Sequence, residues 1–194
     1  MPLFKKSELG GFIKTAGLHD SKMTLIKEAL EFNKDEDYDI FLSHSYQDAN
    51  EILNLKREIE NMGFSIYVDW IDDPKLDRNN VSKKTAQRFK EVISSCKCLF
   101  YVTSENAINS KWMPWELGYA DGNKDGFVAI LPISDEKYDI EIYRGQEYLG
   151  LYSYITRNRI YGSKRETLLV HDNRLKYVDL KNWLDGKLPS LRLP

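Results

Sequence analysis

The stretch KWMPWELGYADG, residues 111–122, places one glutamate among aromatic side chains. A helix here would carry four of these side chains on one stripe, because they are spaced i, i+3, i+4 and i+7: Trp112, Trp115, Glu116 and Tyr119. In one interpretation the rings are ordinary packing and the carboxylate reaches solvent at the rim. In the other, Glu116 is a functional acid in a desolvated setting. A carboxylate beside aromatic rings suits chemistry at a glycosidic bond, because it can hold ribose hydroxyls or stabilise an oxocarbenium-like centre.

The stretch FLSHSYQD, residues 41–48, ends an apolar run in small polar residues. Ser43, His44 and Ser45 would directly follow a buried strand, where ligand-binding loops of α/β proteins are found. The alternative is purely structural. Ser45 and Asp48 match a capping box that starts the next helix, and His44 is then a solvated side chain. These residues alone leave both interpretations open.

The stretch YVDWIDDP, residues 67–74, combines acidic residues with a tryptophan. Asp69 is expected to end a second strand, and Trp70 follows it, so both are candidate ligand contacts. Asp72 and Asp73 are better explained as ordinary turn residues at a strand exit.

The region that positions these residues alternates short apolar runs with amphipathic patterns. Strands are predicted in residues 38–45, 64–70, 98–103 and 126–133, and helices in residues 47–63, 81–96 and 110–122. Strands that are apolar on both faces need helices on both sides, which indicates an α/β fold with a central parallel sheet flanked by helices. Ligands bind such sheets at the carboxyl ends of the strands, so the expected site comprises residues 43–45, 69–70 and 103–106.

The two ends of the chain differ from this core. Residues 1–37 are predicted to form an N-terminal helical extension, and residues 38–160 the main α/β domain. Residues 161–194 are predicted to form a C-terminal hairpin, turning at Asp172-Asn173, and a short helix packed on the main domain. Leu180, Trp183 and Leu184 are expected to point inward from that helix.

Composition excludes several classes of function. The net charge is −2 without a long basic block, so nucleic acid is not an expected partner. No apolar stretch is long enough for a membrane span or a signal peptide, which predicts a cytoplasmic protein. The only cysteines, Cys96 and Cys98, are predicted to be core residues of a reducing compartment. The three histidines are far apart in sequence, so no metal site is expected, and no glycine-rich phosphate loop occurs.

Taken together, three stretches resemble the Toll/interleukin-1 receptor (TIR) domain family: YDIFLSHSYQD, GFSIYVDW, and SSCKCLFYVTSENAINSKWMPWELGYA. The resemblance covers residues 38–135, and the chain looks like bacterial stand-alone members such as the TIR proteins of Thoeris antiphage defence. It implies a flavodoxin-like sheet and cleavage of the nicotinamide–ribose bond of NAD+. It also implies that Glu116 is the catalytic residue, with Trp112 as its partner.

The resemblance also implies how the remaining candidates act. Ser43 and its neighbouring loop would hold ribose or phosphate, while Trp70 and Trp112 would supply stacking faces. No cofactor is expected, since NAD+ is the substrate, and the product would be ADP-ribose, a cyclic isomer or an exchange product. Other TIR domains and a separate downstream effector are the expected protein partners. Two alternatives remain: a non-catalytic scaffold that binds other TIR domains through residues 71–80, and a nucleoside deoxyribosyltransferase-like enzyme.

Overall fold

The computed structural model describes residues 4–9, 38–73, 82–133, 146–160, 163 and 165–191. The predicted N-terminal extension lies outside these residues except for residues 4–9, which include α1 (Lys6–Leu9). Most of the loop considered as a scaffold surface, residues 71–80, also lies outside them. No helix in the described ranges is both long and apolar enough to cross a membrane.

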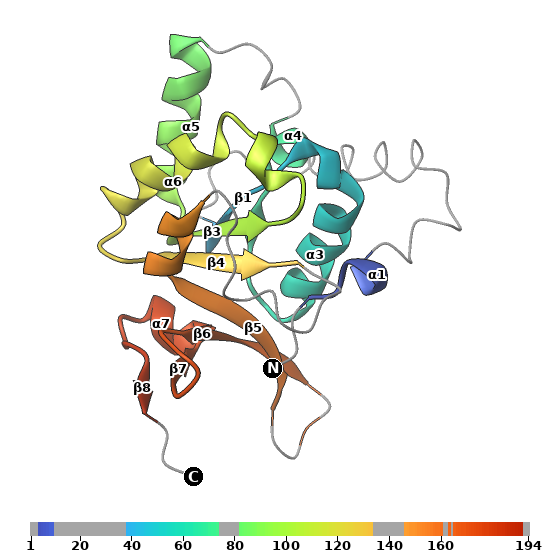
Figure 1. The fold of residues 1–194 in the computed structure, drawn as a ribbon, viewed down its shortest axis with the longest axis vertical. Coiled ribbons are helices and arrows are strands. Elements are labelled where there is room, and N and C mark those ends of the chain that lie inside the picture. Colours follow the sequence, from blue (N-terminus) through green and yellow to red (C-terminus); the bar gives the residue numbers. More distant parts are fainter. Residues whose placement is uncertain are drawn as a thin grey trace.

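The fold is built on one sheet of eight strands in the order β2-β1-β3-β4-β5-β6-β7-β8 (Figure 1). The strands are β1 (Ile40–Ser43), β2 (Ile66–Tyr67), β3 (Cys98–Thr103), β4 (Val128–Pro132), β5 (Ser153–Arg159), β6 (Glu166–His171), β7 (Lys176–Asp179) and β8 (Ser190–Leu191). Pairing is parallel from β2 through β5 and antiparallel from β5 to β8. The predicted α/β fold with a central parallel sheet is confirmed.

Helices cover both faces of this sheet. The longer helices are α3 (Ala49–Asn61), α5 (Lys83–Ser95) and α6 (Met113–Asp121), and the shorter ones are α4 (Asp69–Asp72) and α7 (Leu180–Leu184). Three 3-10 turns precede or follow them: η2 (Tyr46–Asp48), η3 (Ala107–Asn109) and η5 (Glu147–Leu151). One apolar core lies between the sheet and α1, α3 and α7, and a second lies between the sheet and α5 and α6 (Figure 1).

Several predicted element boundaries are wrong. β2 ends at Tyr67, and Asp69 begins α4 rather than ending the strand. The second helix begins at Lys83, because the Ser82 hydroxyl accepts a hydrogen bond from the Thr85 N–H and so caps the helix there. A fifth parallel strand, β5, was missed in a region interpreted as irregular.

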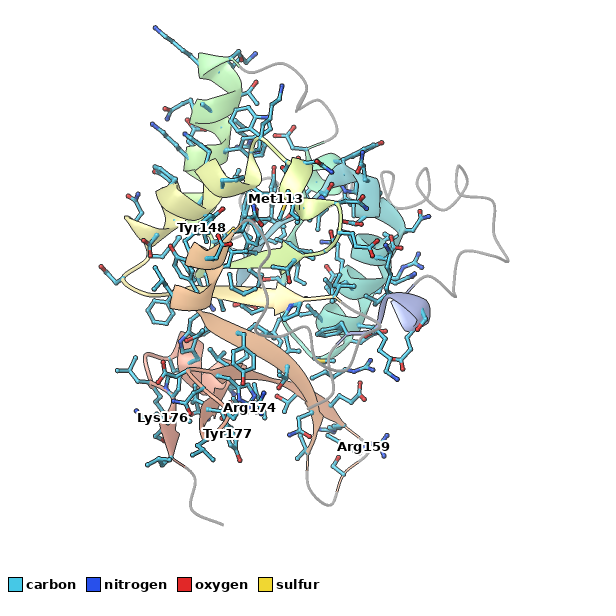
Figure 2. The ribbon with its side chains drawn as sticks, viewed as in Figure 1. Met113, Tyr148, Arg159, Arg174, Lys176 and Tyr177 are labelled. Atoms are coloured by element: carbon cyan, nitrogen blue, oxygen red, sulfur yellow. The ribbon has the colours of Figure 1, made fainter. Side chains whose placement is uncertain are left out.

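The C-terminal hairpin and helix were predicted correctly. β6 and β7 flank residues 172–175, and Leu180 and Trp183 of α7 are buried while Leu184 is partly buried. The Asp179 carboxylate accepts from the Asn182 N–H and caps α7. β6 pairs with β5 from Tyr154 opposite His171 to Arg159 opposite Glu166, so the hairpin continues the same sheet. Figure 2 shows Arg174, Lys176 and Tyr177 at this hairpin, well away from Met113 at the start of α6.

At the amino edge of the sheet, Asp39 joins the starts of three strands. Its carboxylate accepts from the Ser65 N–H at 2.9 Å and lies 2.8 Å from the Lys97 ammonium. Burial alone would raise the pKa of Asp39, but the hydrogen bonds from Lys97 and Ser65 outweigh burial and hold the pKa below its ordinary value. Asp39 therefore stabilises the fold at the edge opposite the expected ligand site.

We expect His171 to make the fold sensitive to mild acid. The imidazole is buried, stacks on Tyr154 and bonds to the Thr156 hydroxyl at 2.8 Å, and burial lowers its pKa below 6.5. The unfolded chain thus binds the proton more readily, so stability is fully present above pH 6.5 and falls as the pH drops below it. Chemical denaturation of the parent and His171→Gln at several pH values between 7.5 and 5 should show the shallower pH dependence in the variant. Identical slopes would contradict this role.

Candidate active site

The carboxyl edge of the sheet brings Ser43 and Glu116 into direct contact. The Ser43 hydroxyl, at the end of β1, donates to Glu116 Oε2 at 2.6 Å. Both side chains are completely buried, although they are 73 residues apart in sequence. A charge-assisted hydrogen bond of this length fixes the orientation of the carboxylate. Glu116, the residue of the strongest sequence prediction, therefore forms one unit with Ser43, a second candidate.

Local signals place Glu116 in the first turns of α6. The Ser110 hydroxyl accepts from the Met113 N–H, Pro114 occupies the first turn, and the Glu116 N–H donates to the Trp112 carbonyl at 2.8 Å. The buried face of this helix carries Met113, Glu116, Leu117 and Ala120. Glu116 is thus the acidic member of an otherwise apolar face that packs on the sheet.

The aromatic residues of the predicted stripe lie on a neighbouring face of α6. The Trp112 ring contacts Phe89 and Trp115 at centroid distances of 5.0 and 5.5 Å. Trp115 and Tyr119 stack at 5.8 Å, and the Tyr119 hydroxyl pairs with Ser94 of α5 at 3.1 Å. Tyr119 is therefore turned towards α5 and does not join the Ser43–Glu116 pair. Substrate contacts by Trp112 and Tyr119 remain predictions.

His44, Asp69 and Trp70 form a second cluster beside Ser43. The Trp70 indole N–H donates to His44 Nε2 at 3.0 Å, and His44 Nδ1 lies 2.8 Å from the Leu42 carbonyl. An indole N–H can only donate, so His44 Nε2 accepts, Nδ1 carries the proton, and the imidazole is neutral. The 3.6 Å between His44 Nε2 and Asp69 Oδ1 is consequently not an ion pair.

The members of this cluster differ in how far they are buried. His44 and Asp69 are buried, and the half-buried Trp70 ring meets Tyr46 edge-on at 6.3 Å. The structure thus brings the three residues together, and their contact with a substrate stays a prediction. Ser45, the remaining candidate, is buried and accepts from the Gln47 N–H at 3.4 Å, in line with a capping role.

The predicted capping box between Ser45 and Asp48 does not form. The Asp48 carboxylate makes no bond to the helix start and instead accepts hydrogen bonds from Ser104 and Asn106 in the loop after β3. That loop was expected at the site, but the partner of Asp48 was missed, because the local spacing of Ser45 and Asp48 already had an explanation.

Sequence reasoning also missed Tyr101 and Gln146. Tyr101 on β3 pairs directly with Ser43 and is buried, and its hydroxyl lies 3.1 Å from the Gln146 amide nitrogen. Burial raises the pKa of Tyr101; the Gln146 hydrogen bond opposes this, whereas Tyr148 and the nearby Glu116 add to it. The phenol is therefore a neutral group, held by Gln146. Figure 2 labels Tyr148 on η5 and Met113 at the start of α6.

The described residues contain no group of three His, Cys, Asp or Glu side chains that could hold a metal ion. A hollow of about 1180 Å³ lies elsewhere, lined by residues that include Glu58, Phe64, Arg157 and Tyr177. It contains neither Ser43 nor Glu116. Its size reflects an open surface around the outer strands, so the buried polar pair at the carboxyl edge is the better candidate for chemistry.

Comparison with known proteins adds two relatives and a family. A family model described as "TIR domain" matches residues 40–187. A protein of Bacillus cereus (strain MSX-D12) named "Probable 3' cyclic ADP-D-ribose synthase ThsB'" is 50% identical over 171 residues, covering 86% of this chain and 88% of that protein. A protein of Cytobacillus dafuensis named "Putative cyclic ADP-D-ribose synthase TIR2" is 36% identical over 84 residues, covering 43% of this chain and 22% of that protein. The chain therefore belongs to the TIR domain family.

Proposed function

We propose that this chain is an enzyme that cleaves the nicotinamide–ribose bond of NAD+ and releases a cyclic ADP-ribose as a signal in antiphage defence. The observation that carries the proposal is the buried pair of Ser43 and Glu116 at the carboxyl edge of a TIR sheet. The names of both relatives, cyclic ADP-D-ribose synthases, support the same reaction.

Nicotinamide is a good leaving group that needs no protonation by the enzyme. When the bond between ribose C1′ and the nicotinamide nitrogen breaks, the electron pair leaves with nicotinamide, which departs as a neutral molecule. The positive charge then remains on the ribose, and Glu116 supplies the negative charge that stabilises it. The Ser43 hydroxyl holds one carboxylate oxygen and so fixes the orientation of Glu116 towards the ribose. Attack by a hydroxyl of the same molecule, with loss of its proton, closes the ring, while attack by water gives ADP-ribose.

Access to this site is part of the proposal. Glu116 is fully buried, so NAD+ can reach it only when covering side chains move. This supports an enzyme whose activity rises on assembly with other TIR domains, so the specific activity should increase with protein concentration. We further propose that a separate effector protein receives the product and that the reaction takes place in the cytoplasm, where NAD+ is supplied.

The test is incubation of the purified chain with NAD+ over a range of protein concentrations. Nicotinamide release follows bond cleavage, and mass spectrometry identifies the product. A cyclic product supports the proposal. The scaffold alternative predicts no nicotinamide at any concentration, and the deoxyribosyltransferase alternative predicts exchange of bases on nucleosides without NAD+ cleavage.

We expect Ser43→Ala to slow nicotinamide release by about 10- to 100-fold. The variant removes a hydrogen bond to a charged group, worth about 1.5–3 kcal/mol, and frees the carboxylate to turn. Steady-state kinetics measure the change in kcat. Ser95→Ala is the matched control, since that hydroxyl donates to the Val92 carbonyl at the end of α5. Equal rates for the parent and Ser43→Ala would remove Ser43 from the mechanism.

A further inference from the structure

Two loops at the carboxyl edge flank Ser43 and Glu116. Residues 44–48 continue directly from Ser43 into η2 and α3. Residues 104–112 lead from β3 through η3 into α6, which carries Glu116. A 2.6 Å hydrogen bond tolerates little displacement, so the pair stays aligned only if these loops keep their relative position.

One carboxylate joins the two loops. Asp48, at the end of the first loop, is 2% exposed. Its Oδ2 accepts from the Ser104 hydroxyl, and its Oδ1 accepts from the Asn106 amide at 2.6 Å. The Asn106 N–H also donates to the Ser104 hydroxyl at 3.2 Å, so the three residues form a closed set of hydrogen bonds.

The hydrogen-bond partners of Asp48 differ from those of an ordinary helix-capping residue. An acidic residue before a helix usually accepts from a backbone N–H of the first turn. Asp48 precedes α3 but makes no such bond, and both of its oxygens point to side chains of the other loop. Burying a charged group for this contact alone is costly, which indicates that the contact has a use beyond starting α3.

We propose that Asp48 is a positioning residue of the reaction, which holds the loop before α6 against the loop after β1 and so keeps Glu116 aligned with Ser43. The inference rests on the proposed NAD+ cleavage. Asp48 acts through Ser104 and Asn106, whose side chains its two oxygens hold.

The test swaps the carboxylate at position 48 and the amide at position 106, first singly and then together. In Asp48→Asn the two charge-assisted bonds become weaker neutral ones, and in Asn106→Asp two carboxylates face each other, so the contact between the loops is weakened in either variant. Each should lower kcat for NAD+ cleavage about tenfold or more with little change in KM, because misplacement affects the reacting geometry rather than binding. In the double variant, the amide introduced at position 48 donates to the carboxylate introduced at position 106 and still accepts from Ser104. This variant should recover kcat to within about threefold of the parent.

A purely structural role is excluded by a matched control. Asp39→Asn removes a carboxylate with similar bonds at the opposite edge of the same strands, and it should lower the thermal midpoint while leaving kcat unchanged. The inference is overturned if Asp48→Asn keeps the parent kcat. It is equally overturned if the double variant recovers the thermal midpoint of the parent but not its kcat.

Amide hydrogen exchange keeps this test independent of the proposed function. In Asp48→Asn, peptides covering residues 104–112 should exchange faster than in the parent, and the double variant should return to the parent rate. If the parent were inactive, the proposed NAD+ cleavage would be refuted. The hydrogen exchange rates would still show whether Asp48 links the two loops. Unchanged exchange in Asp48→Asn would overturn the inference whatever the activity.

Discussion

Glu116→Gln should lower the rate of nicotinamide release by about 10²–10³-fold. Glutamine has the same size and its oxygen still accepts from Ser43, so the variant removes the negative charge and keeps this hydrogen bond. The loss corresponds to about 3–4 kcal/mol of transition-state stabilisation, the scale of one electrostatic group at a developing charge. Single-turnover kinetics with saturating NAD+ measure the chemical step directly.

The fold should survive this change. Replacing a fully buried charge by a neutral isostere removes a desolvation cost, so the thermal midpoint of Glu116→Gln should equal or exceed that of the parent. Glu91→Gln, on the exposed face of α5, is the control and should leave both rate and midpoint unchanged. A Glu116→Gln variant that releases nicotinamide at the parent rate would place the catalytic carboxylate elsewhere.

Trp183→Ala should lower the free energy of unfolding by about 3–5 kcal/mol. The Trp183 side chain is 3% exposed and packs on Phe127, which precedes β4, at a ring distance of 5.2 Å. Removing a large buried side chain costs its transfer free energy and also leaves a cavity. Guanidinium titration followed by far-ultraviolet circular dichroism measures the change without relying on tryptophan emission.

The same experiment shows whether the C-terminal region is integral to the sheet. Leu188→Ala, at a position that is 79% exposed, should change the free energy by no more than about 0.5 kcal/mol. The parent should unfold in one transition that includes β6, β7 and α7, because β6 pairs along β5. If Trp183→Ala lowered the free energy of unfolding by less than about 1 kcal/mol, or if β6, β7 and α7 unfolded in an earlier transition, this region would not be integral to the sheet.

The elements that the sequence predicts well are those with strong local patterns. β1, β3 and β4 are apolar runs, and α3 and α5 have regular apolar faces, so each could be assigned from periodicity. β5 could not, because only the middle of SYITRNR is buried while its second half is largely exposed and polar. What holds β5 in the sheet is its pairing with β4 and β6, which no local window contains.

The helical stripe around Glu116 shows a similar limit. At about 100° per residue, Trp115 and Glu116 lie at opposite borders of a stripe centred near Trp112. The spacing therefore also allows Glu116 to lie on the neighbouring face with Met113, Leu117 and Ala120. Packing of that face on the sheet buries Glu116 there. The neighbouring helix α5 then decides the direction of Tyr119, through Ser94.

The polar contacts at the site depend even more on the tertiary fold. The partners of Asp48 are 56 and 58 residues away, and His44 is 26 residues from Trp70. The strand-end rule correctly brought these loops to one edge, and the resemblance to TIR domains identified Glu116. Neither could say which polar atoms pair, because pairing depends on loop conformation and side-chain rotamers.

The short outer strands of the sheet have a consequence for how copies of this chain can associate. Within the described residues, the sheet ends in β2 on one side and β8 on the other, and each is only two residues long. So short an edge offers few free backbone groups to template the addition of a foreign strand, which protects the chain against amyloid-like growth. Among the described residues, helices and loops therefore offer the larger surfaces for an ordered assembly of copies, and side chains at those surfaces can control its geometry.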